Sequence, residues 1–205
     1  MKGVCYIVGA GDNEGTGFIK EADDFVIAAD GGLLILNSLG IIPDIILGDF
    51  DSLGYIPKGD NIIKHKIQKD DTDMMLAVEK GMELGYKDIT MFGGTGGRTD
   101  HTIANLQTML YASLRGINVK MIDSGNIYRV ITNGKLTLKA REKGTVSVFA
   151  MGGMAKGVTI EGAMYSMKDG ELTSDNPTAV SNSYIGKDIN ISVDSGSLLV
   201  IEERK

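Results

Sequence analysis

Between Val4 and Ile122, the chain alternates short apolar runs with stretches of helical periodicity. This alternation is typical of an α/β domain built on a largely parallel sheet. The apolar runs predict strands at Val4–Val8, Phe25–Ala29, Ile45–Leu47, Ile62–Ile67, Ile89–Phe92 and Val119–Ile122.

Three helices are predicted between these strands. Met75, Val78 and Met82 recur at i, i+3 and i+7, which is the spacing of one buried helix face. A shorter helix is predicted over Gly31–Leu39. The third helix carries a longer stripe of the same kind, made of Ile103, Leu106, Leu110 and Leu114.

From Gly125 onward the pattern changes to short alternating runs separated by Gly, Asn and Asp. This pattern is typical of an antiparallel β-sandwich or partial barrel. We therefore predict an α/β domain over residues 1–124 and an all-β sandwich domain over residues 125–205, joined near Asp123 to Asn126. The strands expected in the second domain are Ile127–Thr132, Gly134–Lys139, Thr145–Ala150, Val158–Glu161, Ile189–Val193 and Leu198–Glu202.

Composition narrows the class of protein. The 205 residues are 42% apolar and 23% charged, as in an ordinary soluble domain. A formal charge of −6 argues against a nucleic-acid surface, which needs clustered Lys and Arg. The single cysteine, Cys5, excludes a disulfide framework and fits a reducing compartment. Neither a signal peptide nor a membrane span is predicted, so we expect a cytoplasmic protein that does not bind membranes.

Two groups of aspartates follow or precede the predicted elements of the first domain. Asp49 and Asp51 come after the strand Ile45–Leu47, and in extended backbone both carboxylates point to the same side. Ligands of open α/β sheets bind at this end of the strands. Turn formation is the alternative interpretation, since Asp and Ser are common turn residues.

Asp70 and Asp73 flank the start of the helix that carries Met75, and at this spacing they can share one helix face. Thr72 and the acidic residues are also typical of a helix N-terminus, and we assign Asp71 to capping or to solvent. Carboxylates gathered in this way repel one another unless a cation lies among them. Mg²⁺ is the simplest such cation, since it prefers oxygen ligands and is often shared with a substrate phosphate.

A glycine-rich segment, Gly93–His101, precedes the third helix. Its glycines let backbone N–H groups approach phosphate oxygens, and Arg98 can add a bidentate cationic clamp. Asp100 can bind metal or cap the helix, and for His101 a hydrogen-bonding role is favoured over that of a base. The spacing Gly9, Gly11, Gly15 does not meet the dinucleotide-binding fingerprint, and the chain has no Walker-type phosphate loop.

Four motifs in this order resemble those of the thiamine pyrophosphokinase family. They are Ala29-Asp30-Gly31-Gly32, Gly48-Asp49-Phe50-Asp51-Ser52, Lys69-Asp70-Asp71-Thr72-Asp73 and Gly93-Gly94-Thr95-Gly96-Gly97-Arg98-Thr99-Asp100-His101. In the second domain, Gly162–Tyr165 and Ser181-Asn182 are similar to the thiamine-side motifs of that family.

The resemblance implies an enzyme that transfers the pyrophosphoryl group of ATP to the hydroxyl of thiamine and releases AMP. It also implies Mg²⁺ as the metal and a homodimer whose active site lies between the α/β domain of one subunit and the β domain of the other. The first domain would then bind ATP and Mg²⁺ and carry out catalysis, and the second would bind thiamine and dimerise.

Carried over position by position, the resemblance assigns roles to individual residues. Asp49, Asp51 and Asp73 correspond to the metal and pyrophosphate cluster and, with Asp100, to the catalytic residues. Tyr165, Ser181 and Asn182 correspond to the thiamine pocket, where an aromatic face stacks on the cationic ligand. The expected nucleotide-binding residues are Asp30, Gly31, Lys69, Asp70, Thr72, Gly96, Gly97, Arg98 and His101.

Two alternative functions remain open from the residues alone. A phosphatase that forms an aspartyl-phosphate on Asp49 would also place Asp-x-Asp after a strand, but it would leave the glycine loop and Arg98 without a role. A non-enzymatic nucleotide or thiamine sensor would not need so many carboxylates in one place.

Overall fold

The computed structural model describes residues 2–14, 16–50, 53–57, 59, 61–64 and 71–204. Contacts between Cα atoms divide the chain into two compact units. The first contains residues 1–112 and 117–124, and the second contains residues 113–116 and 125–205.

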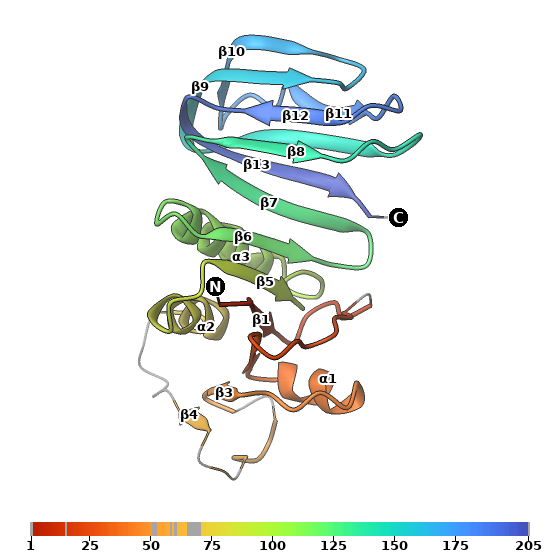
Figure 1. Cartoon of the computed structure of the whole chain (residues 1–205). Helices are drawn as coiled ribbons and strands as arrows, with labels where there is room; N and C mark the ends of the chain where they lie inside the picture. Colours follow the sequence, from red (N-terminus) through yellow and green to blue (C-terminus); the bar gives the residue numbers. More distant parts are fainter. Residues whose placement is uncertain are drawn as a thin grey trace. The chain divides into compact units, whose positions relative to one another are not determined.

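The first unit is built on a sheet with the strand order β4-β3-β2-β1-β5-β6 (Figure 1). Every pairing along this order is parallel, as the sequence predicts. Ile62–Ile67 was predicted as a strand, and its last three residues lie outside the described residues. The strands are β1 (Val4–Val8), β2 (Phe25–Ala29), β3 (Ile45–Gly48), β4 (Ile62–Lys64), β5 (Asp88–Phe92) and β6 (Asn118–Ile122).

Helices cover both faces of this sheet. Helix α1 (Gly32–Ser38) packs its Leu33 and Leu36 against one face, in a core with Val8 and Ala28. Helix α2 (Asp73–Glu83) covers the opposite face, where Gly81 approaches Cys5 so closely that an added Cβ would lie 3.0 Å from the Cys5 sulfur. Helix α3 spans Thr99–Ser113. No helix among the described residues is long and apolar enough to cross a membrane.

The buried faces of α2 and α3 differ from the predicted stripes. In α2 the buried residues are Met74, Leu76, Ala77, Val78 and Gly81, whereas the predicted Met75 and Met82 are only partly buried. In α3 the predicted Ile103 and Leu114 are 53% and 59% exposed. The buried residues of α3 are Asn105, Thr108, Met109, Ala112 and Ser113.

Polar residues can take the buried face of α3 because their side chains find hydrogen-bond partners there. The Thr108 hydroxyl donates to the carbonyl of Ala104 at 3.0 Å, one turn earlier. The Asn105 amide donates to the carbonyl of Gly94 at 2.7 Å. A prediction based on apolar spacing alone therefore chose the wrong face of this helix.

The second unit consists of antiparallel strands in the order β7-β13-β9-β12-β8, with β10 and β11 also paired to β9. Met167–Thr173 and Ala179–Ser183 were not predicted as strands. The strands are β7 (Asn126–Thr132), β8 (Lys135–Leu138), β9 (Thr145–Glu161), β10 (Met167–Thr173), β11 (Ala179–Ser183), β12 (Ile189–Ser192) and β13 (Ser195–Glu203).

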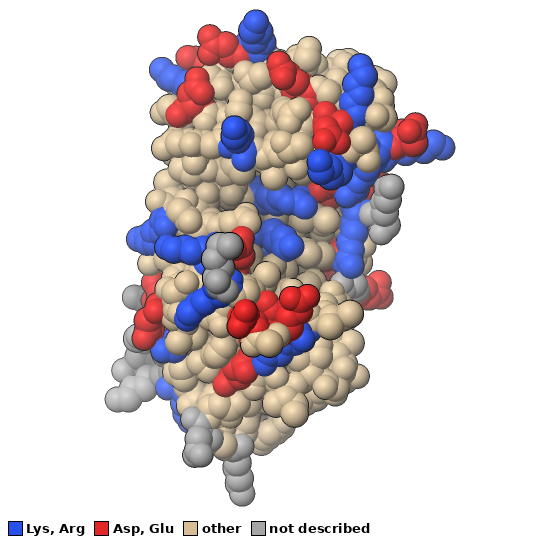
Figure 2. Space-filling model, in the orientation of Figure 1, with Lys and Arg blue, Asp and Glu red and all other residues tan. Residues whose placement is uncertain are grey.

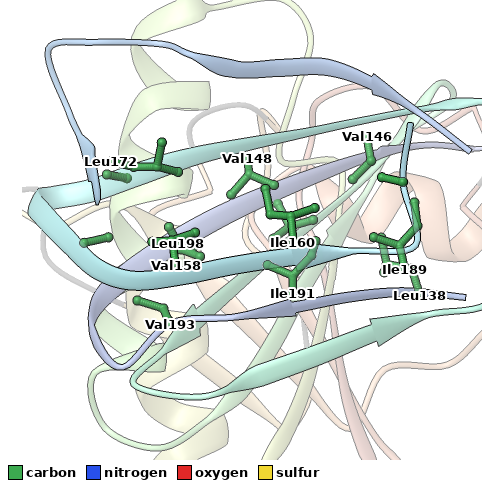
Figure 3. Close-up of a cluster of buried hydrophobic side chains, with 14 of the residues drawn as sticks. Leu138, Val146, Val148, Val158, Ile160, Leu172, Ile189, Ile191, Val193 and Leu198 are labelled. Carbon is green, nitrogen blue, oxygen red and sulfur yellow. The ribbon is translucent and has the colours of Figure 1, made fainter. Parts of the chain in front are cut away.

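Strand β9 joins two runs that were predicted as separate strands. Its first half, around Val148, pairs with β11 and β13, and its second half, around Ile160, pairs with β10 and β12. Gly152 and Gly157 lie between these halves with φ of +70° and +64°, so they bend the strand rather than end it. Buried side chains from both halves meet in one apolar core with residues such as Ile191 (Figure 3).

Cys5 is fully buried in the first unit, under α2. Burial, with a smaller contribution from the Asp44 carboxylate, raises the pKa of its thiol to about 12. Because the thiolate is the reactive form, iodoacetamide is expected to modify Cys5 at least about 100-fold more slowly in the native protein than in urea. Mass spectrometry of timed samples measures both rates, and equal rates would contradict the buried position.

Candidate active site

A cavity of about 420 Å³ lies in the first unit, at the carboxyl ends of its parallel strands. Gly9 follows β1, Asp30 follows β2, Asp49 follows β3 and Gly93 follows β5, and all four line the cavity. Parallel strands end at the same edge of a sheet, which brings these distant segments together. The predicted site residues that line the cavity are Asp30, Asp49, Thr72, Asp73, Gly96, Gly97, Arg98 and His101.

Asp30 is held in an unusual conformation at this edge. Its φ is +45°, and the residue is only 8% exposed. The backbone N–H of Asp30 donates to the carbonyl of Leu47 at 2.7 Å, and Gly48 packs directly on it, since a Cβ there would lie 3.1 Å from the Asp30 Cα. Within the described residues, the Oδ1 atom of Asp30 has no hydrogen-bond partner. A buried carboxylate oxygen without a partner is costly, and this one lies where a ligand or cation can supply the missing contact.

The start of α2 brings a second acidic group to the cavity. Asp73 is the first residue of the helix, and Thr72 is its N-cap, whose hydroxyl accepts a hydrogen bond from the N–H of Met75 at 3.2 Å. Thr72 therefore caps the helix, and Asp71 is exposed and lines the cavity. The predicted site residues Asp51, Lys69 and Asp70 lie outside the described residues.

All five residues of the loop Gly93–Gly97 line the cavity, and four of them are glycines. Gly93, Gly96 and Gly97 have φ of +63°, +80° and +63°, a region that L side chains rarely adopt. The N–H of Gly11 donates to the carbonyl of Gly93 at 2.9 Å, so the loop after β1 packs against this loop. Gly9, Ala10 and Gly11 also line the cavity. Sequence reasoning missed them because it tested this loop only against a dinucleotide fingerprint.

Arg98 and Asp100 form an exposed pair beside the cavity. The guanidinium donates to both carboxylate oxygens, from Nη2 to Oδ2 at 2.6 Å and from Nε to Oδ1 at 3.2 Å. The hydrogen bond from Arg98 is the main reason that the pKa of Asp100 lies below its usual range. Arg98 lines the cavity, whereas Asp100 is not among the described residues that do. The structure therefore brings Asp100 to Arg98 rather than into the cavity.

The three residues predicted for thiamine binding lie together in the second unit. The Asn182 Oδ1 atom accepts from the N–H of Tyr165 at 2.9 Å, and its Nδ2 donates to the carbonyl of Tyr165 at 2.6 Å. Asn182 is 6% exposed, whereas Tyr165 is 68% exposed. Ser181, which precedes Asn182, has a φ of +57°. Asn182 thus fixes the backbone of Tyr165 and leaves the aromatic ring accessible.

Both units match models of one protein family. Residues 19–121 match the model described as thiamin pyrophosphokinase, catalytic domain, and residues 135–198 match thiamin pyrophosphokinase, vitamin B1 binding domain. The chain belongs to the thiamine pyrophosphokinase family. The resemblance that was based on four sequence motifs is confirmed.

Relatives in this family align over nearly the whole chain. A thiamine pyrophosphokinase of Bacillus subtilis is 28% identical over 211 residues, which cover 98% of each chain. Thiamin pyrophosphokinase 1 of Caenorhabditis elegans is 29% identical over 122 residues, covering 55% of this chain and 50% of that protein.

Two crystal structures of family members share the fold. Thiamine pyrophosphokinase from Bacillus subtilis aligns with a TM-score of 0.86 at 25% identity, covering 99% of this chain and 100% of that one. The enzyme from Geobacillus thermodenitrificans aligns with a TM-score of 0.84, also at 25% identity, and 98% of each chain is covered.

The donor set at the cavity of this thiamine pyrophosphokinase family member suits a hard divalent cation. Among the described residues, no three His, Cys, Asp or Glu side chains form a ready-made metal group. Asp30, Asp49 and Asp73 nevertheless line one cavity, and the Asp30 Oδ1 atom lacks a partner in the described part of the chain. Mg²⁺ keeps several waters and phosphate oxygens and needs only one or two protein carboxylates. The residues that are present therefore fit Mg²⁺ bound together with a polyphosphate.

Charge is distributed so that an anionic ligand must be recognised locally. On the face drawn in Figure 2, Lys and Arg side chains stand among Asp and Glu side chains. The chain as a whole carries a formal charge of −6. Nucleotide phosphates would therefore depend on the glycine loop, Arg98 and a metal ion rather than on the field of the whole protein.

Proposed function

We propose that this protein is a thiamine pyrophosphokinase, which transfers the pyrophosphoryl group of ATP to the hydroxyl of thiamine and yields thiamine diphosphate and AMP. The observation that carries this proposal is the match of both the catalytic and the vitamin B1 binding domain models to one chain. The cavity supports it, since carboxylates, a glycine loop and an arginine meet there, as a nucleotide polyphosphate requires. Neither the aspartyl-phosphate phosphatase nor the sensor is favoured by any comparison.

In this reaction the first unit binds and orients the triphosphate. The N–H groups of Gly96 and Gly97 and the guanidinium of Arg98 are proposed to contact phosphate oxygens. Asp49 and Asp73, with Asp51 and Asp70 outside the described residues, are proposed to hold Mg²⁺, which would neutralise charge on the transferred group. Lys69, also outside the described residues, and His101 are proposed to bind phosphate. Catalysis would then rest mainly on positioning and electrostatics, as in phosphoryl transfer generally.

The second unit is proposed to bind thiamine. The exposed ring of Tyr165 can stack on the cationic thiazolium, and Asn182 holds the Tyr165 backbone in place. Ser181, with its left-handed backbone, lies next to Asn182 and is proposed to complete this surface. We further propose that the unit closes as a β-sandwich, and that the protein is a cytoplasmic homodimer in which the β domain of one subunit completes the active site of the other.

Product analysis tests the reaction. Purified protein with ATP, Mg²⁺ and thiamine is expected to form AMP and thiamine diphosphate in equal amounts, measured by liquid chromatography. Formation of ADP and thiamine monophosphate would instead show a kinase that transfers a single phosphoryl group. A phosphorylated Asp49 found by mass spectrometry would instead favour the phosphatase, and binding without turnover under any divalent ion would favour the sensor.

A further inference from the structure

Among its five residues, the glycine loop Gly93–Gly97 carries only one side chain beyond hydrogen, that of Thr95. Glycine backbone has many accessible conformations, so contacts from outside must fix the geometry of such a loop. Thr95 is 6% exposed, and its hydroxyl donates to the Oδ2 atom of Asp123 at 3.0 Å. Asp123 is itself only 8% exposed. A buried hydrogen bond to Asp123 therefore fixes the only side chain of the loop.

Asp123 and Ser124 directly follow β6 and are the last residues of the first unit. Strands β5 and β6 pair with Phe92 opposite Ile122, which places Asp123 beside the start of the glycine loop. The Ser124 hydroxyl donates to the Oδ2 atom of Asp12 at 2.7 Å. This bond is the main cause of a lowered pKa for the Asp12 carboxyl. Asp123 thus contacts the glycine loop and Ser124 contacts the loop after β1, and both loops line the cavity.

The two loops are also joined to each other. The backbone N–H of Asp12 donates to the carbonyl of Thr95 at 2.6 Å, and the N–H of Gly11 donates to the carbonyl of Gly93 at 2.9 Å. Asn105 of α3 adds a hydrogen bond to the carbonyl of Gly94. Three hydrogen bonds from two segments, the loop after β1 and helix α3, therefore hold the loop backbone, and Asp123 supplies the contact to its only side chain.

We propose that Asp123 is a positioning residue for nucleotide binding, and that it acts through Thr95 on the backbone N–H groups of the glycine loop. Asp123 and Ser124 do not line the cavity in the described part of the chain, so they act on the ligand only through the loops. The proposal rests on the proposed function in one respect, namely that the loop binds the phosphates of ATP. No sequence motif identified Asp123, because its role depends on the register of β5 and β6.

Paired variants test the proposal. Thr95→Val removes the hydroxyl and keeps the branched shape, whereas Thr95→Ser keeps the hydroxyl. Calorimetry with Mg²⁺ and a non-hydrolysable ATP analogue is expected to show about tenfold weaker binding for Thr95→Val and a change within about twofold for Thr95→Ser. Asp123→Ala is expected to weaken binding at least as much as Thr95→Val, since Asp123 makes a further interaction besides the hydrogen bond from Thr95. The double variant is expected to bind no more weakly than Asp123→Ala alone, because the hydrogen bond between the two residues is already lost in that variant.

Thr132→Val is the matched control. The Thr132 hydroxyl is hydrogen-bonded to Ser197 at 2.8 Å and to Ser113 at 2.9 Å, and Thr132 is not among the described residues that line the cavity. Hydrogen–deuterium exchange of residues 92–98 is expected to become faster in Thr95→Val and to stay unchanged in Thr132→Val. Unchanged exchange and analogue binding in Thr95→Val would overturn the proposal.

Failure of the proposed function gives a different result. Neither calorimetry nor exchange requires turnover of thiamine, so a wild-type protein that forms no thiamine diphosphate overturns the reaction without deciding the role of Asp123. If the wild type also fails to bind the analogue, the exchange of residues 92–98 decides that role alone.

Discussion

Replacing Asp30 with asparagine is expected to lower kcat/KM for thiamine diphosphate formation by about 100- to 1,000-fold, which is the usual cost of removing one preorganised electrostatic group. Asparagine tolerates the left-handed backbone that Asp30 adopts, with φ of +45°. The variant therefore keeps the shape of the site, while one oxygen of the carboxyl group is replaced by an amide nitrogen that cannot bind a cation. Steady-state kinetics with AMP detection measures the effect.

The same substitution is expected to leave the stability of the protein equal or higher. The Asp30 Oδ1 atom has no hydrogen-bond partner among the described residues, and a buried, unsatisfied polar oxygen is unfavourable for folding. Loss of activity together with retained stability would separate a functional carboxylate from a structural one. Thermal unfolding measures the stability of the variant.

Asp88→Asn is the matched control for Asp30→Asn. Asp88 is exposed at the start of β5, at the opposite end of the strand from the cavity, and accepts a hydrogen bond from Asn118 at 2.7 Å that an amide oxygen can also accept. Its activity is expected to stay within about twofold of wild type, as for ordinary surface substitutions. Activity within tenfold of wild type for Asp30→Asn would contradict the prediction that Asp30 binds the nucleotide.

Replacing Glu202 with alanine is expected to destabilise the second unit by about 3–5 kcal/mol, the usual cost of breaking a buried ion pair. The Glu202 side chain is 3% exposed, and its Oε2 and Oε1 atoms lie 2.5 Å from guanidinium nitrogens of Arg129 and Arg141. The Tyr184 hydroxyl donates to Oε1 at 2.8 Å. Burial and this hydrogen bond raise the pKa of Tyr184. Without Glu202, two largely buried cations would lack their shared anion.

Urea unfolding followed by circular dichroism measures this loss, since the chain has no tryptophan. Glu171→Ala is the control. Glu171 forms an ion pair with Lys156 at 3.8 Å, and both side chains are 59% exposed, so the expected change is within about 0.5 kcal/mol. A loss below about 1 kcal/mol for Glu202→Ala would show that solvent reaches this cluster and replaces the carboxylate.

The strands of the first unit could be predicted from the sequence because each is a short apolar run between polar turns. Helix faces were harder to predict. Five consecutive residues from Met74 to Val78 are apolar, so periodicity could not tell that Met74 rather than Met75 is buried. Gly81 is buried because its missing side chain makes room for Cys5, and no apolar pattern shows such a contact.

In the second unit, the prediction failed where glycine or polar residues occupy strands. The segment between Ala150 and Val158, which contains Gly152 and Gly157, was left out of the predicted strands, but it lies within β9. Strand β10 contains Lys168, Asp169 and Glu171, and only Leu172 among its seven residues is fully buried. This strand is held by its backbone pairing with β9 rather than by buried side chains. The pattern of apolar residues in one sequence does not show which strands pair.

For the site, motifs after strands were informative because the ends of parallel strands converge. Asp49 could be placed at the ligand-binding end of the sheet from sequence for this reason, whereas Asp30 was assigned only through the resemblance to the family. The pair between Arg98 and Asp100 could not, since two residues so close in sequence can point in many directions. Asp12 and Asp123 were missed for a different reason, because their hydrogen bonds join loops that are far apart in the chain.

Strand order in the second unit has a consequence for how the chain is made. Strand β13, the last in sequence, pairs with both β7 and β9, and Thr132 of β7 meets Ser197 across 65 residues. A ribosome adds roughly 5–20 residues per second, so β7 emerges several seconds before its partner in β13 exists. The first unit, whose strands all precede β7, can fold during that time. Until β13 is made, the strand edges of β7 and β9 that it pairs with stay open, and open strand edges favour aggregation of the nascent chain.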